Sequence, residues 1–197
     1  MTLPTLLSQI KQCRECEPKL SHGANPVVQA HESARLLIIG QAPGLRVHKS
    51  GIPWDDPSGD RLRNWLGIRR ELFYSNRVAI VPMGFCYPGK ANSGDLPPRK
   101  ECAPKWHHPL LQTLTGVELT VLIGAHAQQY YLSNNAKFPD KPKTLTETVM
   151  NYRQFLPHYF VLPHPSPRNN IWLKKNPWFE TDVLPELAQQ IKRVKLI

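Results

Sequence analysis

The strongest constraint on the fold is an apolar run, residues 36–39, that ends abruptly in a tight turn. The run is Leu-Leu-Ile-Ile, bounded by Arg35 and Gly40. Four aliphatic residues in a row predict a strand buried on both faces, as in the centre of a parallel sheet. Open α/β sheets bind ligands outside the carboxyl ends of their strands. The turn at 41–44, Gln-Ala-Pro-Gly, is therefore the first place to expect a site.

A second stretch has the same form near the other end of the chain. The β-prone run 159–162 leads into a loop, 163–170, in which three of the first five residues are proline. The polar side chains of this loop include His164, Ser166, Arg168 and Asn169. Prolines fix the backbone, so such a loop presents polar groups rigidly but contributes little to packing.

Strands and helices are expected to alternate along the chain. Expected strands cover residues 36–39, 78–81, 119–123 and 159–162, and expected helices cover 3–12, 59–66, 104–114 and 125–132. We expect loops over 45–59, 82–101 and 133–157, and a C-terminal helical region from Asn176 that Pro185 kinks or splits. The alternation predicts an α/β fold, a three-layer α/β/α arrangement around a mostly parallel sheet, with residues 1–197 in one domain.

The overall charge points to a polyanionic partner. The 197-residue chain has a formal net charge of +10, and its pI is near 9.6. Nucleic acid is the first expectation and an acidic membrane surface the second. No stretch reaches the roughly 20 apolar residues of a membrane span, and residues 1–12 lack the features of a signal peptide. We expect a cytoplasmic monomer.

The four cysteines admit three interpretations. Cys13 and Cys16 have the spacing of a ligand pair, while Cys86 and Cys102 bracket the long loop 82–101. Disulfides are disfavoured in a reducing compartment, which leaves buried free thiols, zinc or an iron-sulfur cluster. The spacing of the cysteines alone does not distinguish a zinc site from an iron-sulfur cluster.

The two loops together resemble the uracil-DNA glycosylase superfamily. Its first motif is a G-x-x-P turn after the first core strand, and its second is a His-Pro-Ser loop near the C-terminus. Residues 40–44 look like the iron-sulfur branch, whereas 164–169, His-Pro-Ser-Pro-Arg-Asn, are similar to the single-strand-selective branch. The four cysteines and the step at 121–127 extend the likeness over most of the chain. The iron-sulfur branch implies a structural [4Fe-4S] cluster, with zinc as the less favoured alternative.

The resemblance also implies roles for individual residues. His164 would stabilise the departing base as an oxyanion, and Gln41 would orient water or the base. It assigns base contacts to Gly40, Ala42 and Trp54, and DNA contacts to Pro43, Gly44, Ser166, Arg168 and Asn169. Met83 and Gly84 are also expected to contact the base, through their backbone amides. Ordinary packing is the alternative for Trp54, and phosphate pairing competes with gap filling for Arg168.

Two departures from the family pattern affect the predicted chemistry. The first motif has Gln41 and Ala42 where a water-activating carboxylate is found in relatives that have one. Asp55 or Asp56 is a possible substitute, although both also suit a turn before a proline. The stretch 81–86 contains no asparagine to pair with a uracil edge, which leaves backbone amides near Met83 and Gly84.

These observations predict a DNA glycosylase of base excision repair that acts on uracil or a related deaminated base. The missing asparagine motivates a different lesion, such as hypoxanthine, as the alternative. The missing carboxylate motivates an inactive iron-sulfur DNA-binding protein as a second one.

Overall fold

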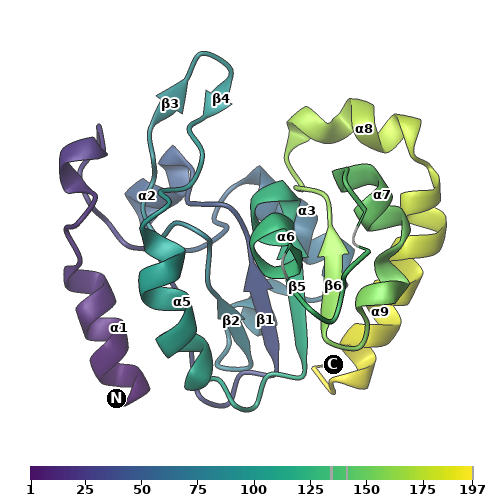
Figure 1. Ribbon diagram of the computed structural model, residues 1–197, viewed down its shortest axis with the longest axis horizontal. Helices are drawn as coiled ribbons and strands as arrows, with labels where there is room; N and C mark the ends of the chain where they lie inside the picture. Colours follow the sequence, from purple (N-terminus) through teal and green to yellow (C-terminus); the bar gives the residue numbers. More distant parts are fainter. Residues whose placement is uncertain (134, 141, 197) are drawn as a thin grey trace.

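The computed structural model describes residues 1–133, 135–140 and 142–196 (Figure 1). Its centre is a four-stranded sheet in the order β2-β1-β5-β6. The strands are β2 (Val78–Ile80), β1 (Leu36–Ile39), β5 (Leu119–Ile123) and β6 (Tyr159–Leu162). Each neighbouring pair is parallel. All four carboxyl ends therefore lie along one edge of the sheet, at the top of Figure 1.

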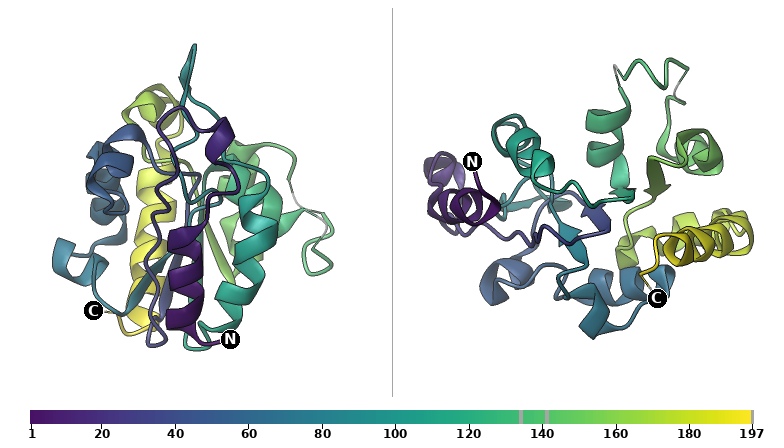
Figure 2. Two further views of the ribbon diagram at one scale, coloured as in Figure 1. Left: turned by 90° about the vertical axis from the view of Figure 1, so that its left-hand side faces the viewer. Right: turned by 90° about the horizontal axis from the view of Figure 1, so that it is seen from below.

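Burial on both faces explains why these strands are so apolar. Every residue of β1, β2 and β5 is buried, and only the first residue of β6 is partly exposed. Helices supply the two outer layers. On one side lie α1 (Leu3–Gln12), α5 (Cys102–Gln112) and α6 (Gly124–Leu132), and on the other lie α3 (Pro57–Leu66) and α9 (Leu184–Arg193) (Figure 2). The three-layer α/β/α prediction is confirmed.

Short helices occupy two segments expected to be loops. The first segment contains α2 (Leu45–Ser50), and the second contains α7 (Leu145–Met150) beside the edge strand β6. Six residues are too few to show a 3.6-residue period. A signal for α7 was nevertheless present, because Thr144 and Glu147 form a reciprocal capping box. The helix α4 (Arg70–Phe73) was also not predicted.

The helix α3 begins two residues before the expected range 59–66. Ser58 lies inside the helix, and the Oδ1 atom of Asp56 accepts a hydrogen bond of 2.8 Å from the amide of Gly59. Pro57 occupies the first helical position, where its missing N–H is no loss.

The long loop 82–101 is not wholly irregular. It contains the hairpin of β3 (Lys90–Ala91) and β4 (Gly94–Asp95), joined by a two-residue turn. Gly94 has φ +97°, which a residue with a side chain rarely adopts. The hairpin projects from the edge that holds the strands' carboxyl ends (Figure 1).

The C-terminal region divides into three helical segments. They are α8 (Asn170–Lys175), a π-helical turn (Phe179–Val183) and α9, so Asn176 ends a helix instead of capping one. The break expected at Pro185 is the change from π to α geometry at Leu184, with Pro185 in the first turn of α9. In the described part of the chain, no helix combines the length and the apolar character needed to cross a bilayer.

Candidate active site

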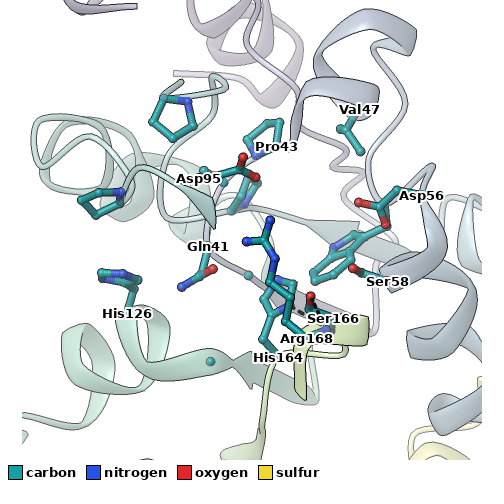
Figure 3. A pocket seen from close by; sticks show the side chains of 18 of the residues that line it. Gln41, Pro43, Val47, Asp56, Ser58, Asp95, His126, His164, Ser166 and Arg168 are labelled. Carbon is teal, nitrogen blue, oxygen red and sulfur yellow. Dashed lines mark hydrogen bonds between the residues drawn. The ribbon is translucent and has the colours of Figure 1, made fainter. Parts of the chain in front are cut away.

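A cavity of about 750 Å³ opens at the carboxyl ends of the four strands (Figure 3). Each strand end contributes a lining residue: Gly40 follows β1, Pro82 follows β2, Gly124 follows β5 and His164 follows β6. The connection after β1 leads to β2 on one side of it, and the connection after β2 crosses back to β5 on the other side of β1. The cavity thus lies at the topological switch point, where open α/β sheets bind ligands.

Gln41 and His164 face one another across the start of α6. A Cβ atom placed on Gly124 would lie 3.8 Å from Cγ of Gln41 and 3.7 Å from Cβ of His164. Gly124 has φ +81°, and this left-handed backbone is the reason that the turn between β5 and α6 favours glycine.

The loop after β6 fixes the tautomer of His164. Its Nδ1 atom accepts a hydrogen bond of 3.2 Å from the amide of Ser166, and its backbone oxygen accepts one of 2.7 Å from Nδ2 of Asn169. Because Nδ1 is an acceptor, the proton of the neutral ring is on Nε2. The ring therefore presents an N–H donor on the side opposite Ser166.

His164 is held in its neutral form. Burial, with a smaller contribution from the positive charge of Arg168, lowers the pKa of His164 to about 4. A neutral imidazole can donate from Nε2 without carrying a charge of its own. At neutral pH the side chain is thus a fixed donor toward the cavity.

Trp54 lies beside His164 in the wall of the cavity. The two ring centroids are 5.5 Å apart, with an interplanar angle of 34°. The Trp54 backbone has φ +56°, and its carbonyl oxygen accepts a hydrogen bond of 3.3 Å from Arg63. A left-handed tryptophan is uncommon and costs free energy. The structure holds the indole against the cavity, in the place from which it can stack on a planar ligand.

Gly40→Ala is expected to lower the free energy of unfolding by about 1–3 kcal/mol, as overpacking does. A Cβ atom at this position would lie 2.7 Å from Cζ2 of Trp54, so the indole must move. Gly44→Ala is the matched control, because its added Cβ would meet atoms no closer than 3.7 Å. Urea unfolding followed by tryptophan fluorescence measures both. Equal free energies of unfolding for the two variants would contradict the close contact between Gly40 and Trp54.

The structure separates the two adjacent aspartates. Asp56 lines the cavity, and its Oδ2 atom lies 4.0 Å from a Cβ placed on Gly44. Burial raises the pKa of Asp56, against the hydrogen bonds from the amides of Gly59 and Ser58. Asp55 instead pairs with Arg70 at 3.1 Å, and that hydrogen bond lowers its pKa. Of these two aspartates, Asp56 is therefore the one that faces the site.

Arg168 reaches from the loop after β6 toward the hairpin. Its guanidinium contacts the position that a Cβ of Gly94 would occupy, so the glycine makes room for it. The same hairpin adds Asp95, whose Oδ1 accepts a hydrogen bond of 3.3 Å from Tyr87. Figure 3 shows Arg168 and Asp95 converging on the cavity.

Two predicted base contacts are not where they were expected. Met83 and Gly84 are absent from the cavity lining. Their amides donate to the backbone oxygens of Gly40 and Gln41, each at 2.9 Å. The prediction that these amides bind a base is a poor fit to the structure, because both hydrogen bonds already hold the two strand ends together.

A buried histidine supports the floor beneath these strand ends. Nε2 of His107 lies 3.0 Å from the backbone oxygen of Pro82, and its Nδ1 lies 2.5 Å from the hydroxyl of Tyr131. The ring also stacks on Phe85. Burial lowers the pKa of His107 to about 4.

Folding stability is expected to fall as the pH drops from about 6.5 toward 4. His107 and His164 both have a pKa near 4 in the folded chain, whereas an unfolded histidine titrates at about 6.5. The unfolded state therefore binds more protons in this window, which makes unfolding more favourable at lower pH. Urea unfolding of wild type and His107→Asn between pH 7 and 4.5 tests this, with a weaker pH dependence expected for the variant.

Most of the predicted site residues meet at one cavity. Its lining includes Gly40, Gln41, Ala42, Pro43, Gly44, Trp54, His164, Ser166, Arg168 and Asn169. Sequence reasoning missed His126 and Asp95 as lining residues. The exposed His126 points toward the cavity from the first turn of α6 (Figure 3). Only its place directly after an expected strand, in the step 121–127, was a signal for it.

The four cysteines border a second, smaller cavity. Cys13, Cys16, Cys86 and Cys102 line it together with Leu20, Ala24, Pro26, Phe85, Arg99 and Trp106. All four are free cysteines. The cavity brings the segment after α1 against the loop 82–101 and the first residue of α5.

The four thiols share the lining of one cavity. Within the described ranges, no group of three or more His, Cys, Asp or Glu side chains is arranged to hold a metal ion. By the chemistry of its donors, a set of four cysteines suits zinc or an iron-sulfur cluster.

One protein-family model matches this chain. The model of the uracil DNA glycosylase superfamily matches residues 28–188. The matched segment contains all four strands and both loops that form the large cavity. Because the match covers most of the chain, this protein belongs to the uracil DNA glycosylase superfamily.

Proposed function

We propose that this protein is a DNA glycosylase that hydrolyses the N-glycosidic bond of uracil or a related deaminated base in DNA. The observation that supports this most is the fixed Nε2–H donor of His164 in a cavity that Trp54 also lines. A base must leave the duplex stack to enter such a pocket, which costs a few kcal/mol. Stacking on the indole would offset part of that cost.

His164 would donate a hydrogen bond to the departing base, on which negative charge develops. Negative charge gathers on the oxygens of a uracil-type base as the N-glycosidic bond breaks, and positive charge gathers on the sugar. A fixed donor at the forming oxyanion is worth about 2.7–4 kcal/mol. Neutral His164 meets this requirement, because burial keeps its pKa at about 4.

Asp56 would replace the missing carboxylate of the first motif. It comes from the cap of α3, and one of its oxygens is close to Gly44 in that motif. Burial raises its pKa, which makes the carboxylate a better proton acceptor than an exposed one. We propose that Asp56 activates the attacking water and that Gln41, which lies beside His164, orients the water or the base. An active enzyme is thus favoured over a protein that only binds DNA.

The remaining loop residues would hold DNA. Ser166 and Arg168 lie at the rim, where the phosphate backbone would pass. Phosphate contacts position the nucleic acid without reading its sequence. The net charge of +10 favours the same partner.

The test is base release by protein purified without oxygen. Single-lesion oligonucleotides containing uracil, hypoxanthine or xanthine would be supplied in single- and double-stranded form. We expect uracil to be released fastest. Release of hypoxanthine alone would move the assignment to a different lesion, and release of no base at any concentration that binds the DNA would overturn it.

We also propose that Cys13, Cys16, Cys86 and Cys102 hold a structural [4Fe-4S] cluster, as in the iron-sulfur branch. Support comes from their shared cavity and from a buried guanidinium nitrogen in its wall that lacks a partner within the described chain. The cluster would join α1 to the loop 82–101 and take no part in base release. The His-Pro-Ser-Pro-Arg-Asn loop would combine this branch with the second motif of the single-strand-selective branch.

Cys102→Ser is expected to remove most of the iron and sulfide from the anaerobically purified protein. A hydroxyl is a poor substitute for a soft thiolate ligand of iron. Iron and acid-labile sulfide per chain are the measurement, with Ser21→Ala as a control outside the cysteine cavity. Zinc without sulfide in the wild type would contradict the cluster.

A further inference from the structure

Arg99 is the one charged side chain in the lining of the cysteine cavity. Its side chain is 30% exposed, yet its Nε atom is buried and has no hydrogen-bond partner in the described structure. A buried donor without a partner is costly. The cost of burying Nε of Arg99 would be lower if a negatively charged group in the cavity accepted a hydrogen bond from the Nε–H.

An ion-pair network holds the guanidinium in place. Nη2 of Arg99 donates to Oε1 of Glu101 at 2.7 Å, and Nζ of Lys19 reaches the same oxygen at 2.9 Å. Both cations therefore bind one carboxylate oxygen, and the carboxylate anchors one end of the guanidinium. Because Nη2 is anchored on Glu101, the Nε edge of the guanidinium is left free.

The backbone of Arg99 is fixed by close packing. A Cβ atom placed on Gly84 would lie 3.2 Å from the amide nitrogen of Arg99 and 3.2 Å from Cβ of Pro98. Glycine at this position lets the segment approach the end of β2. Arg99 also makes a side-chain contact with Cys16. The chain therefore places the cation beside a sulfur atom through constraints on both its backbone and its side chain.

We propose that Arg99 donates its Nε–H to a thiolate sulfur of the cluster and offsets part of the cluster's negative charge. This inference rests on the proposed [4Fe-4S] centre. Four thiolates around a [4Fe-4S]²⁺ core carry a net charge of −2, and hydrogen bonds to the sulfurs are among the factors that set cluster potentials. Arg99 would stabilise the reduced form most, since that form carries the larger negative charge.

Arg99→Gln is expected to release iron to a chelator about tenfold faster than wild type, because a charge-assisted hydrogen bond is lost. The midpoint potential of the cluster is expected to become more negative by about 60 mV, which is a tenfold change for a one-electron couple. Arg99→Lys keeps the charge but loses the Nε donor, so its values should fall between these.

Lys100→Gln is the matched control, because it removes the same charge from an exposed neighbouring residue. Iron and sulfide content, the rate of iron release and the potential would be measured on each anaerobically purified variant. Wild type without iron and sulfide would overturn the cluster itself. A loaded wild type with Arg99→Gln equal to Lys100→Gln would leave the cluster standing and overturn the role of Arg99. If Arg99→Gln does not fold, Arg99→Lys decides the question by the same comparison.

Discussion

His164→Ala is expected to slow base release about 10²–10³-fold, which is the usual effect of removing one oxyanion donor. The donor is Nε2–H, because Nδ1 accepts the Ser166 amide. Single-turnover release from uracil-containing oligonucleotides, with enzyme in excess, measures the chemical step apart from product release. DNA affinity measured in parallel should change much less, since the ring is not proposed to contact phosphate.

The control for this variant is a histidine at the opposite end of the same strand, β6. His158 is exposed and immediately precedes β6, whereas His164 follows the other end of that strand. His158→Ala should therefore release base at the wild-type rate. His164→Gln should lie between wild type and His164→Ala, because an amide can donate but is not held in the same way. If His164→Ala released base at the wild-type rate, His164 would not be the oxyanion donor.

Asp56→Asn is expected to reduce the rate about 10²–10⁴-fold, the range for general acid–base catalysis. This substitution is informative because asparagine caps helices as well as aspartate does. The amide oxygen can still accept from the amide of Gly59, so α3 should keep its first turn. Loss of rate without loss of stability would then isolate the carboxylate as a base.

Asp55→Asn supplies the matched comparison. It removes the same charge one residue away, from a carboxylate that pairs with Arg70 at 3.1 Å and does not line the cavity. The release rate should stay within about twofold of wild type, since an exposed ion pair contributes little. Two results would contradict the role of Asp56 as the base. One is an equal reduction of the release rate in Asp55→Asn and Asp56→Asn, and the other is a wild-type release rate for Asp56→Asn across pH 5–8.

The strands were predictable because burial on both faces leaves a plain mark on the sequence. The runs 36–39, 119–123 and 159–162 are strands with those bounds. Parallel strands place their carboxyl ends together, so the turn 41–44 and the loop 163–170 had to meet. That topological rule, together with the resemblance, predicts most of the cavity from the sequence.

The parts that escaped prediction depend on contacts between distant segments. Asp56 directly precedes Pro57 and so has the position of a helix cap, but the contact of Asp55 with Arg70 joins segments that are distant in sequence. The amides of Met83 and Gly84 looked available, but strand ends from another part of the chain use them. Short helices such as α2 and the hairpin β3–β4 are below the length at which periodicity is detectable.

The packing of α1 has a consequence for anyone who trims this protein to the segment that the family model matches. A fragment that starts at residue 28 would retain the whole segment matched by the family model. It would also lose Cys13 and Cys16, two of the four side chains that border the smaller cavity. In addition it would uncover the apolar surface that Leu3, Leu6 and Ile10 of α1 help to bury. The family boundary is therefore not a safe cloning boundary, and we expect such a fragment to be poorly soluble and free of iron.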